Sequence, residues 1–241
     1  MVFGTRKKGK KKPGQHSEQE QVLTEKSPWP VQEAYKALRT NLMFSLPGND
    51  NKVIGVTSAL QHDGKSINAV NLAISFAQLG KKVMLVEADL RMPTIGKKLG
   101  CRLVPGITDV LVGQSYLMNV IQTSGEYRTL SVITAGNIPP DPTWLLQSNQ
   151  MKAIVNVLRK EYDYVFIDLP PVTSVADALI LAPLLDGYVL VVRDQVTEYR
   201  AVADTLDQLQ LAKAKVIGIV YNDAETAGSG KYYHSGYYKK D

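Results

Sequence analysis

The sequence predicts an α/β fold with a doubly wound, mostly parallel sheet. Short runs rich in β-branched and other apolar residues alternate with longer segments of helical periodicity. The apolar runs are continuous, which indicates strands covered on both faces. Strands that alternate with helices form parallel sheets with right-handed crossovers. A length of 241 residues and an apolar fraction of 44% suit one large domain with a single core.

The elements follow in order from these patterns. A first helix begins after Pro28 and Pro30, carries apolar residues at helical spacing from Ala34 to Leu46, and ends at the PGND segment. Strands are expected at residues 52–58, 82–88, 129–135, 164–168, 188–193 and 215–221. Further helices are expected at about residues 65–79, 143–160, 175–185 and 198–212.

The net charge of +5 is concentrated at the amino terminus. Residues 1–12 contain six Lys and Arg residues and no acid, so the rest of the chain carries a net charge of −1. Such a basic segment either lies on anionic lipid, at about 1 kcal/mol per basic residue, or is a solvated end. Because the remainder is nearly neutral, we expect no nucleic-acid partner. We predict a basic flexible arm at 1–27, a folded domain at 28–222 and a flexible tail at 223–241.

The chain lacks the marks of an exported or membrane-spanning protein. Cys101 is the single cysteine, which excludes an internal disulfide and favours a reducing compartment. No run approaches the 18 or more apolar residues of a membrane span, and the first twelve residues lack the apolar core of a secretory signal. A cytoplasmic protein is expected.

A phosphate-binding motif follows the first predicted strand. The segment ALQHDGKS at residues 59–66 fits GxxxxGK(S/T), with Ala59 in the first glycine position, and it opens a predicted helix. Backbone N–H groups at a helix start favour an anion, Lys65 supplies a positive charge for the outer phosphates, and Ser66 offers a hydroxyl to Mg²⁺. The motif predicts nucleotide binding.

Acidic residues stand at the ends of two further strands. Glu87, Asp89 and Arg91 lie at the end of one strand. Another ends in Asp168 after four apolar positions, which is the pattern of a Walker B acid. Ligands of doubly wound sheets bind beyond the carboxyl ends of the strands. Mg²⁺ takes only one or two carboxylates besides phosphate oxygens and water, so Ser66, Asp89 and Asp168 are sufficient to hold it.

Taken together, these segments resemble the bacterial tyrosine kinases of capsule and exopolysaccharide systems, in the cytoplasmic form of low-GC Gram-positive bacteria. The resemblance covers about residues 31–241. The matching segments are EAYKALRTNLMFS, TSALQHDGKS with NLA, LVEADLRMP, GITDVL, GNIPPDPTWLLQS, YVFIDLPPV with VADA, and a terminal tyrosine cluster.

The resemblance implies a P-loop kinase domain of the MinD and ParA fold at residues 28–222, with ATP and Mg²⁺ as cofactors. It also implies autophosphorylation on terminal tyrosines and a ring-shaped homo-oligomer. The implied partners are a membrane adaptor of the polysaccharide co-polymerase type, which activates the kinase and recruits it to the inner face of the membrane, and a cognate tyrosine phosphatase.

The family's site residues map onto this chain by position. The catalytic set is Lys65, Glu87, Asp89, Arg91 and Asp168. The nucleotide-binding set is Gln61, His62, Asp63, Gly64, Lys65, Ser66, Ile67 and Asn222.

Several of these positions depart from the family pattern. Glu87, the implied general base, stands where the family has Asp and is one methylene longer. Gln61, His62 and Asp63 replace Pro-Gly-Glu or similar, and Ile67 replaces Thr. Arg91 either steadies phosphate charge or pairs with a neighbouring acid.

The first helix and the tail carry two further implied sites. Glu33, Lys36 and Arg39 match the oligomerisation pattern Glu-x-x-Arg-x-x-Arg except at Lys36, and a local Glu–Lys surface pair is the alternative. The implied phosphoacceptors are Tyr232, Tyr233, Tyr237 and Tyr238. Four phosphates would add about −6 to −8 to a tail whose charges balance.

Two other functions stay open. A partitioning ATPase of the ParA or MinD type would carry a lysine early in the phosphate loop, where this chain has Leu60, and would lack clustered terminal tyrosines. A nucleotide-binding adaptor with weak or no kinase activity is the other alternative, which His62 and Glu87 keep open.

Overall fold

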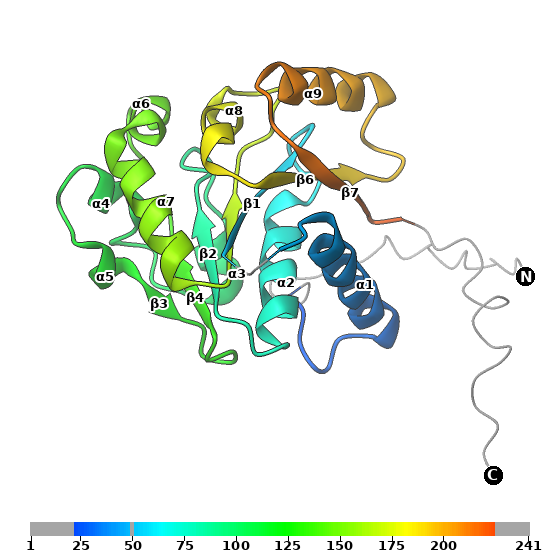
Figure 1. The fold of residues 1–241 in the computed structure, drawn as a ribbon, viewed down its shortest axis with the longest axis horizontal. Coiled ribbons are helices and arrows are strands. Elements are labelled where there is room, and N and C mark those ends of the chain that lie inside the picture. Colours follow the sequence, from blue (N-terminus) through cyan, green and yellow to red (C-terminus); the bar gives the residue numbers. More distant parts are fainter. Residues whose placement is uncertain (1–21, 49–50, 225–241) are drawn as a thin grey trace, which may run out of the picture.

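A seven-stranded sheet forms the centre of the computed structural model, which describes residues 22–48 and 51–224 (Figure 1). The strand order is β3-β4-β2-β5-β1-β6-β7, and every neighbouring pair is parallel except β3 and β4. The strands are β1 (Lys52–Ser58), β2 (Val83–Glu87), β3 (Gln122–Thr123), β4 (Leu130–Ile133), β5 (Tyr164–Asp168), β6 (Gly187–Arg193) and β7 (Val216–Asn222). The predicted doubly wound α/β fold is confirmed.

Helices cover both faces of this sheet. They are α1 (Trp29–Ser45), α2 (Lys65–Ala77), α3 (Ile95–Leu99), α4 (Ile107–Leu111), α5 (Leu117–Val120), α6 (Pro142–Gln147), α7 (Asn149–Glu161), α8 (Asp177–Ile180), the 3₁₀ turn η2 (Ala182–Leu184) and α9 (Tyr199–Leu211). Helices α1 and α2 lie side by side on one face, and α7 packs on the other (Figure 1).

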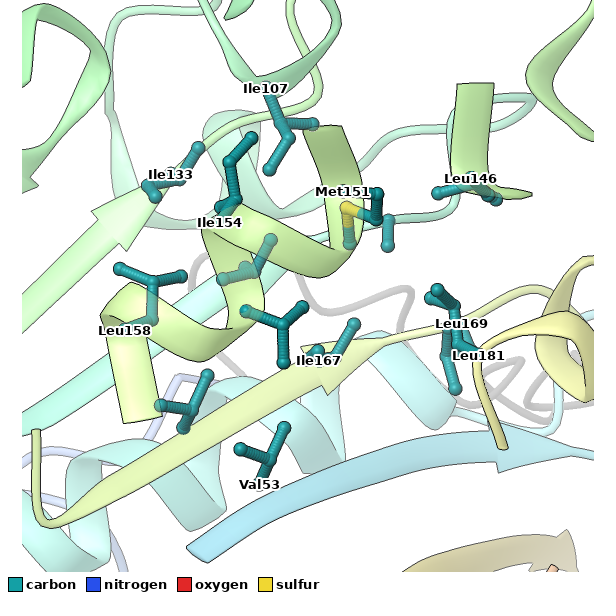
Figure 2. Close-up of a cluster of buried hydrophobic side chains, with 14 of the residues drawn as sticks. Val53, Ile107, Ile133, Leu146, Met151, Ile154, Leu158, Ile167, Leu169 and Leu181 are labelled. Atoms are coloured by element: carbon teal, nitrogen blue, oxygen red, sulfur yellow. The ribbon is translucent and has the colours of Figure 1, made fainter. Parts of the chain in front are cut away.

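Two apolar cores result from the alternation of side chains along each strand. In β2, Val83 and Leu85 belong to the core beneath α2, whereas Met84 and Val86 belong to the core beneath α7. Successive residues of a strand point to opposite faces, so a strand buried on both sides must be apolar throughout. Figure 2 shows the second core, where Ile154 and Leu158 of α7 pack over the sheet.

The predicted strands are all present, and the helices differ where local polar chemistry intervenes. The expected helix at 143–160 is interrupted at Ser148, whose backbone is extended and whose hydroxyl accepts a hydrogen bond from the Met151 N–H (3.1 Å) as the N-cap of α7. The expected helix at 175–185 divides into α8 and η2, with Pro183 in the first turn of η2. Strand β3 and helices α3 to α5 are too short to produce a periodic pattern and were not predicted.

The folded part begins before residue 28. Leu23 is only 2% exposed and belongs to the core beneath α2. Its N–H donates to Asn71 Oδ1 (2.8 Å), and its carbonyl accepts from the Tyr127 hydroxyl (3.3 Å). Residues 22–27 therefore pack on the domain, although the sequence pattern places them in the flexible arm. The basic residues at positions 1–12 and the four terminal tyrosines lie outside the described residues.

Polar side chains fix helix α1 on helix α2. The Tyr35 hydroxyl donates to Asn68 Oδ1 and accepts from Asn71 Nδ2, each at 3.1 Å. One turn further along, Arg39 donates to the Ser75 carbonyl (2.6 Å). These groups are partly buried and would lack partners if the two helices shifted, so they determine how the helices sit against each other.

In the part of the chain that the structure covers, none of the helices combines the length and apolar character that a bilayer span requires.

We expect Leu23→Ala to lower the free energy of unfolding by about 2 kcal/mol or more, because it leaves a cavity in the core. Leu79→Ala is the matched control, since Leu79 is 49% exposed and its truncation should cost little. Urea unfolding followed by circular dichroism measures both. Equal small effects would show that residues 22–27 do not pack on the domain.

Candidate nucleotide site

The phosphate loop connects β1 to α2 in a conformation that its sequence restricts. Gly64 has φ +95°, and a Cβ there would collide with the Asn222 side chain, so only glycine fits. His62 also lies in the left-handed region, with φ +68°. Histidine is among the residues that tolerate this region, so its presence in a glycine position is compatible with the loop.

Asp63 holds the loop in place from behind. Its Oδ2 accepts from the Leu60 N–H (2.8 Å), and its Oδ1 accepts from the Thr197 hydroxyl (2.7 Å). Asn222 Nδ2 donates to the Asp63 carbonyl (3.0 Å). Neither Asp63 nor Asn222 lines the cleft, so both shape the loop from outside it.

Lys65 stands between two carboxylates at the centre of the site. Its Nζ lies 2.7 Å from Asp89 Oδ2, 3.5 Å from Asp168 Oδ1 and 3.1 Å from Ser66 Oγ. The four residues come from the start of α2 and from the ends of β2 and β5, as expected for the carboxyl edge of a parallel sheet. Burial lowers the pKa of Lys65, but the two carboxylates outweigh burial and raise it above its ordinary value.

Asp168 is buried at the middle of the sheet. It pairs with Glu87 of β2 on one side and with Val56 of β1 on the other. Among the described residues, neither of its carboxylate oxygens accepts a hydrogen bond. Burial raises the pKa of Asp168 to about 6, although Lys65 draws it down. In the described part of the chain its charge is met only by the Lys65 ammonium at 3.5 Å, so the carboxylate can also bind a metal cation.

The donors around Lys65 fit Mg²⁺. Asp168, Asp89 and Ser66 present hard oxygen atoms, which Mg²⁺ prefers. No cluster of three His, Cys, Asp or Glu side chains that could hold a metal alone occurs within residues 22–48 and 51–224. The arrangement therefore suits an ion that completes its shell with water and phosphate oxygens.

Glu87 takes part in the structure of the sheet edge. Its Oε1 accepts from the Ile95 N–H (2.5 Å) at the start of α3, and its Oε2 accepts from the Ala135 N–H (3.0 Å) just after β4. Burial raises the pKa of Glu87, and the backbone hydrogen bonds oppose this rise. Both oxygens are occupied by backbone N–H groups, so this geometry does not favour the expected role of general base.

Arg91 pairs with a neighbouring acid, which was one of its two expected roles. Its Nε lies 2.8 Å from Asp177 Oδ2, and its Nη2 donates to Asp177 Oδ1 (3.2 Å) and to the Thr143 hydroxyl (3.0 Å). The Asp177 side chain is fully buried. Arg91 still lines the cleft, so the pair fixes a cation at its wall.

The cleft in front of these residues has a volume of about 540 Å³, within the range of small-molecule sites. Its predicted lining residues are Gln61, His62, Gly64, Lys65, Ser66, Ile67, Asp89 and Arg91. Lys98 and Arg193 also line it and were not predicted. Arg193 ends strand β6, and a charged residue at a strand end was a usable signal, whereas Lys98 on the short helix α3 gave none.

The three residues of the expected oligomerisation motif differ in their contacts. Lys36 pairs with Glu33 (2.8 Å) on the surface of α1, which is the local pair considered as the alternative. Arg39 reaches inward and donates to Ser75 of α2. An interface between copies of the chain remains an expectation for this helix.

Comparison with known proteins places the chain among P-loop NTPases. A family model described as ParA, NUBPL iron-transfer P-loop NTPase, matches residues 49–234. The tyrosine-protein kinase YwqD of Bacillus subtilis (strain 168) is 39% identical over 206 residues, which are 86% of this chain and 85% of that protein. The predicted ParA and MinD type of fold is confirmed.

Two solved structures are similar to the whole domain. The chimerical protein CapA2B2 has a TM-score of 0.77 and 31% identity, with 82% of this chain and 86% of that chain covered. The kinase domain of the Escherichia coli tyrosine kinase ETK has a TM-score of 0.76 and 31% identity, with 83% of this chain and 80% of that chain covered.

We expect the buried Asp168 to make stability depend on pH. Its pKa is about 6 in the folded protein and about 3.8 when unfolded, so the folded state binds the proton more tightly between these values. The resulting contribution, on the order of 3 kcal/mol, is complete below about pH 4 and is lost as the pH rises through 6. Urea unfolding of the wild type and Asp168→Asn in metal-free buffer measures it. Parallel pH profiles would contradict the assignment.

We expect Glu87→Gln to lower the free energy of unfolding by about 1–3 kcal/mol, because an amide cannot accept from both the Ile95 and the Ala135 N–H groups. Glu161→Gln is the control, since Glu161 is exposed and makes only a loose pair with Lys82. Thermal and urea unfolding report both. If Glu87→Gln leaves the protein as stable as the wild type, the structural role is refuted.

Proposed function

The chain belongs to the bacterial tyrosine kinases of capsule and exopolysaccharide systems, and from this membership we propose that it transfers the γ-phosphoryl group of ATP to tyrosines of its own C-terminal cluster. The observation that carries the proposal is the position of Lys65 between Asp89 and Asp168, beside the hydroxyl of Ser66. Charge neutralisation and positioning are what phosphoryl transfer requires of a protein.

Ser66, Asp89 and Asp168 would hold Mg²⁺ at the phosphate loop, some of them through water. When bound, this ion supplies positive charge against the phosphate oxygens. The Lys65 ammonium, now paired with the two carboxylates, would turn to the outer phosphates. The N–H groups at the start of α2 add to this positive environment.

A tyrosine substrate needs a group that accepts its proton, since a phenol with a pKa of about 10 is mostly protonated at pH 7. Asp89 lines the cleft, whereas Glu87 is held by backbone N–H groups behind it. We therefore assign general-base duty to Asp89 in preference to Glu87.

The proposed acceptors are Tyr232, Tyr233, Tyr237 and Tyr238. The described chain ends at residue 224, directly after Asn222 contacts the phosphate loop. Tyr238 lies fourteen positions beyond residue 224, and a chain of that length spans about 45 Å when extended. That reach supports transfer within one chain or to a neighbouring copy.

Partners belong to the same proposal. Membership in the kinases of capsule and exopolysaccharide systems supports this part of the proposal. We infer a membrane adaptor of the polysaccharide co-polymerase type that recruits this kinase from the cytoplasm to the inner face of the membrane. A cognate tyrosine phosphatase and a ring of kinase copies, formed through the α1 residues Glu33, Lys36 and Arg39, complete the proposed system.

We expect Lys65→Met to reduce incorporation of labelled γ-phosphate by about 100-fold or more, because a charge aimed at the phosphates is lost. The full chain with ATP and Mg²⁺ is followed by autoradiography, and mass spectrometry locates the phosphotyrosines. Lys82→Met removes an exposed lysine away from the cleft and should label normally.

Three results would contradict the proposal. Unchanged labelling of the Lys65 variant would remove the catalytic assignment. ATP hydrolysis without phosphotyrosine in the wild type would favour a partitioning ATPase, and neither hydrolysis nor labelling would favour a nucleotide-binding adaptor. A thermal unfolding curve of each variant shows that the fold is intact.

A further inference from the structure

Arg193 is a cation of the cleft for which the proposed mechanism has no task. It ends strand β6, where it lies opposite Asn222 of β7 in the sheet register. It lines the cleft together with the phosphate-loop residues, and its Nη1 lies 3.5 Å from the His62 carbonyl oxygen. Its Nε forms an ion pair with Asp223 Oδ2 at 2.8 Å.

Asp223 occupies the point where the C-terminal tail leaves the domain. The two residues before it are fastened to the sheet edge: the Tyr221 hydroxyl donates to Asp194 (2.6 Å), and Asn222 donates to the Asp63 carbonyl (3.0 Å). Asp223 is thus the first tail residue whose side chain contacts a residue that lines the cleft.

The ion pair between Arg193 and Asp223 is exposed enough that Arg193 can readily exchange Asp223 for another anion. The Arg193 side chain is 39% exposed and the Asp223 side chain 57% exposed. Partly exposed ion pairs are weak, so breaking this one would change the equilibrium constant for nucleotide binding by only a few-fold. A phosphate group, in contrast, accepts two parallel hydrogen bonds from a guanidinium and carries more charge than a carboxylate.

The other acids near Arg193 are already engaged. Both oxygens of Asp63 accept hydrogen bonds from Leu60 and Thr197, and Asp194 accepts from Tyr221. Asp223 is therefore the carboxylate that holds Arg193 in the structure.

We propose that Arg193 is an anion-binding residue of the nucleotide cleft and that Asp223 is its partner only while the cleft lacks phosphate. On nucleotide binding the guanidinium turns from Asp223 to the phosphate oxygens. Asp223, the first residue of the tail, then loses its contact with the cleft. This inference rests on the nucleotide binding in the proposed function. Phosphate and Asp223 compete for the same guanidinium, so phosphate binding weakens the ion pair and the ion pair weakens phosphate binding by the same factor.

Binding of a fluorescent ADP analogue with Mg²⁺ to the full chain tests this inference. Asp223→Asn should bind about two- to five-fold more tightly, because Arg193 no longer has to leave a carboxylate. Arg193→Gln should bind about ten-fold more weakly or worse, and Arg193→Lys should recover part of the loss through its point charge. The double variant should match Arg193→Gln within two-fold, since Asp223 acts through Arg193.

Asp194→Asn is the matched control, because it removes one negative charge next to Arg193 in sequence from a carboxylate that binds Tyr221. It should leave the affinity within about two-fold of the wild type. A gain equal to that of Asp223→Asn would overturn the inference, because a general change of charge would then explain the effect. Thermal unfolding confirms that each variant is folded.

Competition by inorganic tripolyphosphate identifies the part of the nucleotide involved. Arg193→Gln should weaken this competitor as much as it weakens the ADP analogue. Weaker ADP binding with unchanged tripolyphosphate binding would overturn the phosphate assignment, as would wild-type affinity of Arg193→Gln for both. Absence of nucleotide binding by the wild type would overturn both this inference and the proposed function, whereas normal wild-type binding with unaltered variants would overturn the inference alone.

Discussion

A lysine held between two buried carboxylates is the interaction around which the site is built. Lys65 begins α2, Asp89 follows β2, and Asp168 ends β5, so the cluster forms only when the parallel strands end at one edge. Buried carboxylates are costly unless a cation meets them. The ammonium of Lys65 meets that need in this structure, and the same oxygens suit Mg²⁺ when the lysine turns to phosphate.

Much of this arrangement could be predicted from the sequence because its signals are local. The phosphate loop, the lysine and the hydroxyl beside it are consecutive residues, and each acid stands directly after a run of apolar residues that marks a strand. Helix and strand periodicity then gave the fold class. The convergence of Lys65, Asp89 and Asp168 followed from a general property of parallel sheets, whose carboxyl ends meet at one edge.

What could not be predicted depends on contacts between distant segments. The polar character of the arm hid Leu23, because two apolar residues, Val22 and Leu23, among polar ones carry no periodicity, although Leu23 is buried in the core. Glu87 was expected to be the general base, but α3 and the residue after β4 bring backbone N–H groups to both of its oxygens. The partner of Arg91 lies 86 residues away, at Asp177, and no local spacing connects the two.

The polar contacts between α1 and α2 have a mechanical consequence. Tyr35 and Arg39 are joined to Asn68, Asn71 and Ser75 on the helix whose first residue is Lys65. Sliding α1 along α2 would break all of these hydrogen bonds at once, so the two helices move as one rigid unit. A displacement of α1, such as one caused by a partner that binds its outer surface, would therefore also move the start of α2, where the phosphate loop ends.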